Sequence, residues 1–176
     1  MTDHAPQRKV VPWLASAVHL VLAPGLVAGL VPWLVTRWHV ADHPGWVDPL
    51  RWAGLLVALG GAALVTAEFV RFARAGGSPA PPVPTATLVT AGTYRWVRNP
   101  MYVAVVAAIL GQAAWFVSGW LVVYAAVAFV VMAMFVIAYE EPTLRDQFGD
   151  DYVAYCRDVP RWIPRKLAQR NRVSAR

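Results

Sequence analysis

The chain has 176 residues, of which 58% are hydrophobic and only 15% are charged. A typical soluble domain has about 45–50% apolar and about 25% charged residues, so this chain has too few charges to cover its apolar material with a water-facing surface. The apolar excess also excludes intrinsic disorder, and the single cysteine, Cys156, excludes a disulfide scaffold. The composition predicts an integral membrane protein.

The positive charge of the chain does not indicate a nucleic-acid-binding protein. The formal net charge is +6, and the Lys and Arg residues gather in short segments between apolar runs and in the C-terminal tail. A nucleic-acid-binding domain would place them along one face of a soluble fold. The observed placement favours anchors for anionic lipid headgroups and determinants of membrane orientation. We expect neither a nucleic acid nor a metal ion as a partner.

The first apolar run follows a polar N-terminal segment, residues 1–11, that contains Arg8 and Lys9. The apolar core of a signal peptide is about 7–15 residues long, and this run is longer. About 20 residues of helix cross the hydrocarbon core of a bilayer. We therefore expect a transmembrane helix over residues 12–36, bent near Pro24-Gly25.

A polar loop over residues 37–49 follows, and it contains three potential metal ligands, His39, Asp42 and His43. No other ligand is predicted to converge on them, and Pro44-Gly45 is a common turn sequence. We interpret the segment as a connection between two spans rather than as a metal site.

The second predicted span covers residues 50–72 and carries one acidic residue, Glu68, near its end. An ionisable residue inside a span is a functional candidate by default. Arg71 and Arg74 follow closely, however, so Glu68 also fits an ion pair at the membrane interface. The sequence leaves both interpretations open.

The next segment, residues 75–92, is rich in Pro, Gly and small residues and is predicted to be a loop. No Asp, Glu, Lys or Arg then occurs between Arg98 and Glu140, which is too long a run for one crossing and about right for two. Ser118-Gly119 offers a break in the middle. We expect a hairpin of helices over 100–117 and 119–139.

The tail over residues 140–165 changes character, because apolar residues recur there at a spacing of three or four and charges fill the other positions. This pattern predicts an amphipathic helix at the surface of the membrane domain. The apolar positions are Leu144, Phe148, Tyr152, Tyr155 and Val159. Residues 166–176 form a basic tail.

These elements define an all-α, polytopic membrane protein with about four transmembrane helices and a C-terminal cytoplasmic amphipathic helix. Basic residues are favoured on the cytoplasmic side of a membrane. They are concentrated in the N-terminus, the loop between the second and third spans, and the tail. The sequence therefore predicts that both termini are cytoplasmic.

Polar groups are expected to converge at the cytoplasmic end of the hairpin. The loop over residues 84–100 and the pair Glu140-Glu141 flank the same two helices. The residues brought together there are Tyr94, Arg98, Asn99, Tyr102, Glu140, Glu141 and the basic residues of the tail. A purely structural interpretation is also open, in which one glutamate pairs with Arg145 or Arg98 and Arg98 is only an orientation anchor.

Two stretches resemble sequence signatures of the isoprenylcysteine carboxyl methyltransferase and phospholipid methyltransferase superfamily. Residues Ala86–Tyr102 read ATLVTAGTYRWVRNPMY, which is similar to the pattern LVTxGxYxxxRHPxY. The tail reads YEEPTLRDQFGDDYVAYCRDVPRWIP, which is similar to EExxLxxxFGxxYxxYxxxVPRxxP. The two motifs occur in the expected order, are separated by a helical hairpin, and cover residues 86–164.

The resemblance implies a membrane methyltransferase that depends on S-adenosyl-L-methionine and acts on a lipophilic acceptor. It divides the chain into the two spans of 12–72, a cofactor-binding region over 73–165, and the flanking segments 1–11 and 166–176. By position in the motifs, Arg98, Asn99 and Glu141 would be catalytic. The implied cofactor-binding residues are Ala86, Thr87, Leu88, Val89, Tyr94, Asn99, Pro100, Met101, Tyr102, Glu140 and Glu141.

The chemistry of these residues suits such a cofactor. Arg98 and Asn99 offer donors to its carboxylate, and Glu140 or Glu141 offers acceptors to its ammonium and ribose hydroxyl groups. The aromatic faces of Tyr94 and Tyr102 suit the adenine ring or the sulfonium. Because methyl transfer is an in-line displacement, positioning supplies most of the catalysis.

The chain departs from the superfamily pattern at two places. Asn99 replaces the histidine that precedes the proline, so a proton-transfer role is not expected at this position. The prenylcysteine enzymes have a substrate-binding arginine one turn before the paired acids, whereas this chain has the apolar residues 135–138 there. The acceptor is therefore left as the carboxyl or amine of a lipid or of a membrane-soluble small molecule.

Two other functions are compatible with the sequence. A fold-related membrane reductase would use NADPH, whose 2′-phosphate could be bound by Arg157, Arg161 and Arg165. A non-catalytic membrane scaffold would keep both motifs only for packing.

Overall fold

The computed structural model describes residues 24–74 and 88–164, and every regular element within these ranges is helical. In chain order the elements are η1 (Leu26–Leu30), α2 (Val31–Thr36), η2 (Gly45–Val47), α3 (Asp48–Arg74), η3 (Gly92–Arg95), α4 (Pro100–Phe116), α5 (Gly119–Phe135), η4 (Val136–Glu140) and α6 (Glu141–Asp158). The first half of the span predicted over 12–36 lies outside the described residues. So do Ala86, Thr87 and the basic tail.

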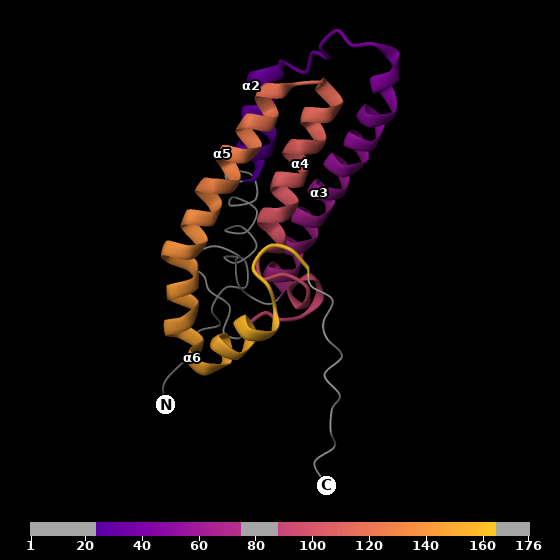
Figure 1. Cartoon of the computed structure of the whole chain (residues 1–176). Coiled ribbons are helices and arrows are strands. Elements are labelled where there is room, and N and C mark those ends of the chain that lie inside the picture. The colour runs from indigo at the N-terminus through magenta and orange to yellow at the C-terminus, as the bar shows by residue number, and fades with distance from the viewer. Residues whose placement is uncertain (1–23, 75–87, 165–176) are drawn as a thin grey trace, which may run out of the picture.

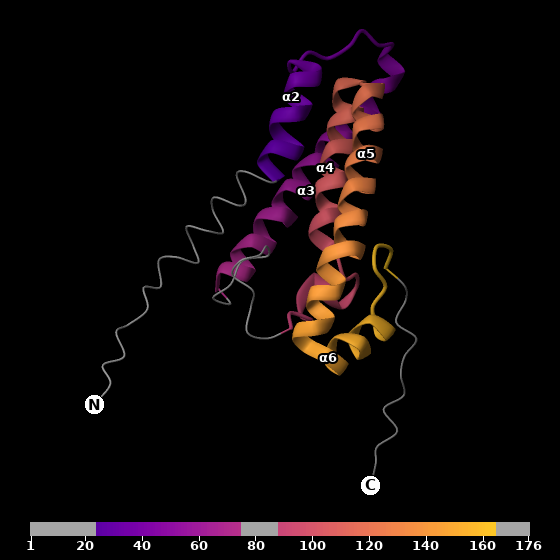
Figure 2. The same ribbon diagram turned by 90° about the vertical axis from the view of Figure 1, so that its left-hand side faces the viewer.

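Helices α3, α4 and α5 form an elongated bundle with the described part of the first helix packed along it (Figure 1). The loop over 37–49 and the α4–α5 turn lie together at one end of the bundle (Figures 1 and 2). Helix α6 and the segments 88–99 and 159–164 lie at the opposite end, which we call the site end. The turn is built as the sequence predicts, because α4 ends at Val117 in the left-handed conformation and α5 begins after Ser118.

Small residues allow α3 and α4 to pack backbone against backbone. A Cβ atom on Gly61 would lie 2.6 Å from the carbonyl oxygen of Ala104, and one on Gly111 would lie 2.5 Å from the backbone nitrogen of Ala58. Close approach through glycine and alanine is the usual way in which helices associate when no water is present to drive apolar burial. This contact fixes the relative positions of the two helices that carry the site.

The first described helix is attached to the bundle by side chains that compensate for a proline. Pro32 has no N–H group to donate to the carbonyl of Ala28, four residues earlier, and the carbonyl of Val27 lies in the π-helical turn η1 just before it. The Gln112 amide donates to the Ala28 carbonyl at 2.8 Å, and the Tyr124 hydroxyl donates to the Val27 carbonyl at 2.8 Å. Helices α4 and α5 thereby satisfy backbone groups that lipid could not satisfy.

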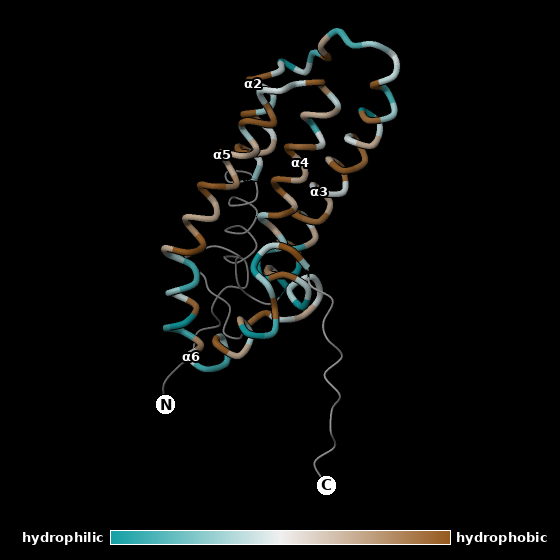
Figure 3. The backbone as a smooth tube through the Cα atoms, in the orientation of Figure 1, coloured by the Kyte–Doolittle hydropathy of each residue, from teal (hydrophilic) through white to brown (hydrophobic). Residues whose placement is uncertain are grey.

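The exterior of the bundle is suited to lipid. Two helical stretches, Gly45–Phe72 and Gly119–Asp158, are long and apolar enough to cross a membrane, whereas Leu26–Thr36 and Pro100–Phe116 are shorter apolar helices. Large apolar side chains on α5 are exposed, including Trp120 at 77%. The apolar residues occupy the middle of the bundle, and polar residues gather at α6 and at the opposite loop (Figure 3). Such an exterior is typical of a membrane protein.

The helix boundaries follow the sequence predictions closely, with two differences. The helix predicted over 119–139 ends as a regular α-helix at Phe135 and continues as the π-helical turn η4. The helix predicted over 140–165 is interrupted at Gly149, whose φ of 54° and ψ of −128° require glycine, and ends at Asp158. Tyr152 on this helix and Val159 directly after it are buried.

Candidate functional site

The two sequence motifs meet at the site end through hydrogen bonds to backbone carbonyls. The Arg98 N–H donates to the carbonyl of Pro160 at 2.9 Å, and the Asn99 side-chain amide donates to the carbonyl of Arg161 at 3.2 Å. The Tyr155 hydroxyl donates to the carbonyl of Tyr94 at 2.7 Å. The loop before α4 and the chain after α6 are therefore held together, as the predicted hairpin requires.

Glu141 is the centre of an ion-pair network that joins the motifs. Arg161 binds its carboxylate with two nitrogens, Nε at 2.7 Å and Nη2 at 2.8 Å, and Arg98 Nη1 lies 3.1 Å from Oε1. Such two-pronged arginine–carboxylate pairs are strong and geometrically specific. The carboxylate of Glu141 raises the pKa of the Arg161 guanidinium. Arg98 Nη1 also lies 2.8 Å from the sulfur of Cys156, whereas its buried Nε has no hydrogen-bond partner among the described residues.

The π-helical turn η4 places the two adjacent glutamates in different surroundings. At its end the N–H of Glu141 bonds to the carbonyl of Val136, five residues earlier, and Pro142 follows without an N–H. The extra residue in this turn changes the direction in which the following side chains point. Glu140 accepts a hydrogen bond from the Tyr102 hydroxyl on α4, and within the described chain its second oxygen accepts none. Of the two glutamates, Glu140 is therefore the one with a carboxylate oxygen that can still accept a hydrogen bond.

Tyr94 lies between the loop, α3 and the glutamates. Its ring packs edge-on against Phe72, with 5.8 Å between ring centroids. Burial raises the pKa of the Tyr94 hydroxyl, and the negative charges of Glu68 and Glu140 raise it further. The hydroxyl therefore stays protonated at physiological pH and is available as a hydrogen-bond donor.

Glu68, whose role the sequence left open, belongs to the same end of the bundle. Its side chain is fully buried, and its Oε1 accepts a hydrogen bond from the Thr93 hydroxyl at 2.7 Å. Arg71 Nη1 lies 3.4 Å from its other oxygen and donates to the carbonyl of Ala91. The carboxylate is thus oriented toward the loop that contains the first motif.

The remaining site residues predicted from sequence differ in burial where the structure describes them. Asn99 and Pro100 are buried, and Leu88, Val89 and Met101 are half-buried. Sequence reasoning did not identify Cys156 as a neighbour of Arg98 or Arg161 as the main partner of Glu141. The VPR sequence of the second motif was the available indication for Arg161, and no sequence pattern indicated Cys156.

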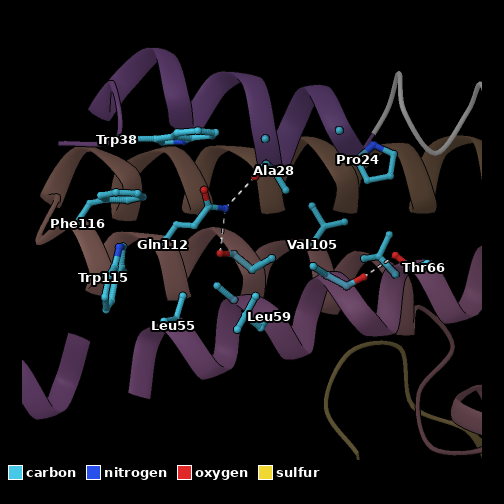
Figure 4. Close-up of a pocket in the computed structure, with 16 residues that line it drawn as sticks. Pro24, Ala28, Trp38, Leu55, Leu59, Thr66, Val105, Gln112, Trp115 and Phe116 are labelled. Atoms are coloured by element: carbon cyan, nitrogen blue, oxygen red, sulfur yellow. Dashed lines mark hydrogen bonds between the residues drawn. The ribbon is translucent and has the colours of Figure 1, made fainter. Parts of the chain in front are cut away.

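A cavity of about 620 Å³ lies between the first described helix, α3 and α4. Figure 4 shows that the side chains around it are mostly apolar and that the Gln112 amide donates a hydrogen bond to the Ala28 carbonyl. The cavity reaches Val65 and Thr66, less than one helical turn from Glu68. Its lining residues are Pro24, Gly25, Ala28, Gly29, Trp38, Leu55, Ala58, Leu59, Ala62, Val65, Thr66, Val105, Ala108, Gln112, Trp115 and Phe116.

The loop at the other end holds together by polar contacts of its own. His43 Nδ1 lies 3.0 Å from the carbonyl of Ala41, and His43 Nε2 lies 2.7 Å from Arg51 Nη1 and 3.1 Å from Asp48 Oδ1. Arg51 also stacks over the ring of Trp115. Over residues 24–74 and 88–164, no group of three or more His, Cys, Asp or Glu side chains is arranged to hold a metal ion.

The fold and the site together define a class of protein: a helical membrane protein with a polar, charge-paired site at one end of a helical hairpin. The family model for phospholipid methyltransferases matches residues 49–151, which is more than half of the chain. The protein belongs to the phospholipid methyltransferase family. No curated protein matches the chain.

Proposed function

We propose that the protein is an S-adenosyl-L-methionine-dependent methyltransferase that acts on a lipophilic acceptor. It crosses the membrane four times with both termini in the cytoplasm, and its active site lies at the inner leaflet, at the site end of the bundle. The proposal rests on the family match together with the geometry of the two joined motifs.

The distribution of basic residues supports this orientation. Arg71, Arg74, Arg95 and Arg98 lie at the site end, whereas Arg37 and Arg51 lie at the other. Positively charged residues accumulate on the cytoplasmic side of membrane proteins. The cofactor, which is water-soluble, would then reach the site from the cytoplasm.

The observation that carries the cofactor assignment is an unpaired polar atom on one residue of each motif, a nitrogen of Arg98 in the first and an oxygen of Glu140 in the second. The buried Nε of Arg98 lacks an acceptor among the described residues, and one oxygen of Glu140 accepts no hydrogen bond from them. A buried polar atom left unpaired is costly and calls for an explanation. A ligand that carries both a carboxylate and an ammonium group, as the methionyl part of the cofactor does, satisfies both atoms.

The residues then take distinct roles. Arg98 binds the carboxylate of the cofactor, Glu140 binds its ammonium or ribose hydroxyls, and the rings of Tyr94 and Tyr102 cover its uncharged parts. Glu141 and Arg161 hold Arg98 in place rather than contacting the cofactor. When bound, the cofactor supplies an electrophilic methyl group. The protein mainly positions the acceptor in line with that group.

The apolar cavity supports a lipid-like acceptor. It opens between helices whose outer surfaces face lipid, so a hydrocarbon chain can enter it sideways from the bilayer. The turn before the paired acids contains no arginine for a prenylcysteine carboxylate. The chain of the acceptor would lie in the cavity with its reactive group toward the site end.

The structure gives less support to an NADPH-dependent reductase. Arg161, one of the three arginines available for a 2′-phosphate, already makes two hydrogen bonds to Glu141. A phosphate would have to compete with this pair. NADPH should therefore not displace a bound methyl-donor analogue.

Calorimetric titration of the purified protein with S-adenosylhomocysteine tests the proposal. We expect saturable binding that NADPH does not compete with, and a loss of about 10- to 100-fold in affinity for Glu140→Gln, because a charge-assisted hydrogen bond contributes about 1.5–3 kcal/mol. Asp151→Asn, which neutralises an exposed carboxylate on α6, should bind like the unchanged protein. Folded protein that does not bind S-adenosylhomocysteine would contradict the proposal.

A further inference from the structure

One glutamine projects into the apolar cavity between the first described helix, α3 and α4. Gln112 is the only residue of α4 with a side-chain amide, and none of the described residues that line the cavity is charged. An amide in apolar surroundings costs free energy unless its donors and its acceptor are hydrogen-bonded. The partners of the Gln112 amide therefore indicate its role.

The nitrogen of this amide has a structural role. Nε2 donates to the carbonyl of Ala28 at 2.8 Å and to the carbonyl of Ala108 at 3.3 Å, which uses both of its hydrogens. The reverse orientation would place the amide oxygen against two carbonyl oxygens, so these contacts determine which end of the amide is the nitrogen. In Figure 4 the amide oxygen points away from both hydrogen bonds.

The oxygen of the same amide has no comparable partner. Gln112 Oε1 accepts no hydrogen bond within the described residues. The Thr66 hydroxyl, which also lines the cavity, donates to the carbonyl of Ala62 on its own helix at 2.9 Å. An amide oxygen accepts up to two hydrogen bonds. The cavity therefore contains an acceptor position that the described bundle leaves open.

A hydrogen-bond donor lies next to this acceptor. Trp115 follows Gln112 by three residues on α4, so the two side chains are neighbours on the helix surface, and both line the cavity. The indole N–H of Trp115 has no acceptor among the described residues. Its ring is held by an edge-on contact with Trp52, at 5.0 Å between ring centroids, and by Arg51, which stacks over it at 4.8 Å.

An open acceptor beside an open donor fits one kind of ligand group. A hydroxyl has a donor and an acceptor on one oxygen, so it binds to two side chains that are one helical turn apart. An ammonium only donates and a carboxylate only accepts, and either would bring a charge that no described lining residue balances. A plain alkyl chain would leave both Gln112 Oε1 and the Trp115 N–H unpaired.

We propose that Gln112 and Trp115 bind a hydroxyl group on the hydrocarbon chain of the methyl acceptor. The hydroxyl donates to Gln112 Oε1 and accepts from the Trp115 indole N–H. The inference rests on the proposed function, which places this chain in the cavity with its reactive group toward the site end. Ten residues of α4 separate Gln112 from Tyr102, so the hydroxyl lies about 15 Å from the group that is methylated.

Three probes of equal chain length test the two hydrogen bonds separately. Dodecanol donates and accepts a hydrogen bond, dodecyl methyl ether only accepts one, and dodecane does neither. We would measure saturable binding of each labelled probe to the full chain in nanodiscs, above the partitioning into empty nanodiscs. The unchanged protein should bind dodecanol about 3- to 10-fold more tightly than the ether, and the ether about 3- to 10-fold more tightly than dodecane.

Two variants remove the hydrogen bonds one at a time. Trp115→Phe keeps a ring but removes the N–H, so it should abolish the preference for the ether over dodecane and keep that for dodecanol over the ether. Gln112→Met removes Oε1 and should have the opposite effect.

Each variant has a matched control outside the cavity. Tyr124→Phe removes the donor to the Val27 carbonyl on the same helix that Gln112 supports, and Trp120→Phe removes an indole N–H from the exposed surface of α5. Tyr124 and Trp120 do not line the cavity. Both control variants should bind the three probes like the unchanged protein.

The same hydroxyl site should influence methyl transfer. With labelled S-adenosylmethionine, we would compare ω-aminododecanol with dodecylamine and ω-hydroxydodecanoic acid with dodecanoic acid. In whichever pair is methylated, kcat/KM should be about 3- to 10-fold higher for the hydroxylated chain. Gln112→Met should remove this preference, because it removes the acceptor for the hydroxyl.

Three results would overturn the inference while leaving the proposed function intact. The unchanged protein would bind dodecanol and dodecyl methyl ether equally, or Gln112→Met would keep the preference for dodecanol. Alternatively, Gln112→Met and Tyr124→Phe would both lose all three probes, which would assign Gln112 a purely structural role. Failure of the unchanged protein to bind S-adenosylhomocysteine would instead refute the proposed function, and the order of the probe affinities would still test the hydroxyl site.

Discussion

Two neighbouring glycines on α3 allow a direct test of how the helices that carry the site are packed. Gly60 and Gly61 are adjacent on the same helix, but only Gly61 faces α4. A Cβ atom on Gly60 would have no neighbour within 4 Å, whereas one on Gly61 would lie 2.6 Å from the backbone oxygen of Ala104 and 3.0 Å from the backbone nitrogen of Ala108. Gly61→Ala and Gly60→Ala therefore make the same chemical change in opposite surroundings.

The size of the expected change in stability follows from these distances. The contact at Gly61 is about 0.8 Å shorter than the 3.4 Å at which ordinary contacts begin, and the opposing atoms are backbone that cannot rotate away. Separating the helices by that amount would weaken the neighbouring contacts by about a quarter to a half. Overpacking of this kind costs about 1–3 kcal/mol. Gly60→Ala should instead be neutral or gain up to about 1 kcal/mol of helix propensity.

Thermal unfolding in detergent measures the difference in stability between the two variants. It can be followed by tryptophan fluorescence or by a thiol-reactive fluorescent dye. Since 1 kcal/mol corresponds to about 2–4 °C in a protein of this size, Gly61→Ala should lower the Tm by about 2–12 °C. Gly60→Ala should leave it unchanged or raise it by a few degrees. Equal shifts for the two variants would refute the packing of α3 against α4.

Three further predictions concern single contacts. Tyr124→Phe leaves the Val27 carbonyl without its donor and should cost about 0.6–1.7 kcal/mol, seen as a fall in Tm with unchanged S-adenosylhomocysteine affinity; a fall in affinity alone would contradict this. Asn99→Ala removes the donor to the carbonyl of Arg161 and should lower the Tm by about 2–4 °C. Asn99→His retains an N–H donor, so its Tm should stay closer to that of the unchanged protein. Identical Tm values for the two variants would count against the contact. Arg161→Lys loses the two-pronged contact with Glu141 and should weaken S-adenosylhomocysteine binding measured by calorimetry, and full retention of affinity would exclude a positioning role for Arg161.

The helices could be predicted because their causes are local. Absence of charge from Asn99 to Tyr139 indicated two spans, and Ser118-Gly119 indicated the break between them. The interruption at Gly149 could not be predicted, because a glycine in a helical pattern does not reveal a left-handed conformation. The π-helical turn η4 was missed for a similar reason, since Pro142 shows that a hydrogen bond is lost but not how the chain responds.

The juxtaposition of the two motifs could be predicted from the sequence, whereas the pairing of their side chains could not. The hairpin brings the first motif to Glu140 and Glu141 whatever the side chains do, and the structure confirms that juxtaposition. Which glutamate pairs with arginine depends on the direction of the η4 turn and on the path of the chain after α6. The burial of Glu68 likewise depends on where Thr93 places the loop, which no spacing in the sequence determines.

We propose that the junction of the two motifs transfers a methyl group to a lipid. The most direct measurement is the incorporation of labelled methyl from S-adenosylmethionine into the lipids of vesicles that contain the purified protein, compared with Glu140→Gln. We predict label in the lipid fraction with the unchanged protein and at least a tenfold loss with the variant, as expected for a charge-assisted contact to the cofactor. Vesicle lipids that stay unlabelled by protein that binds S-adenosylhomocysteine, or label that is unaffected by Glu140→Gln, would contradict the account.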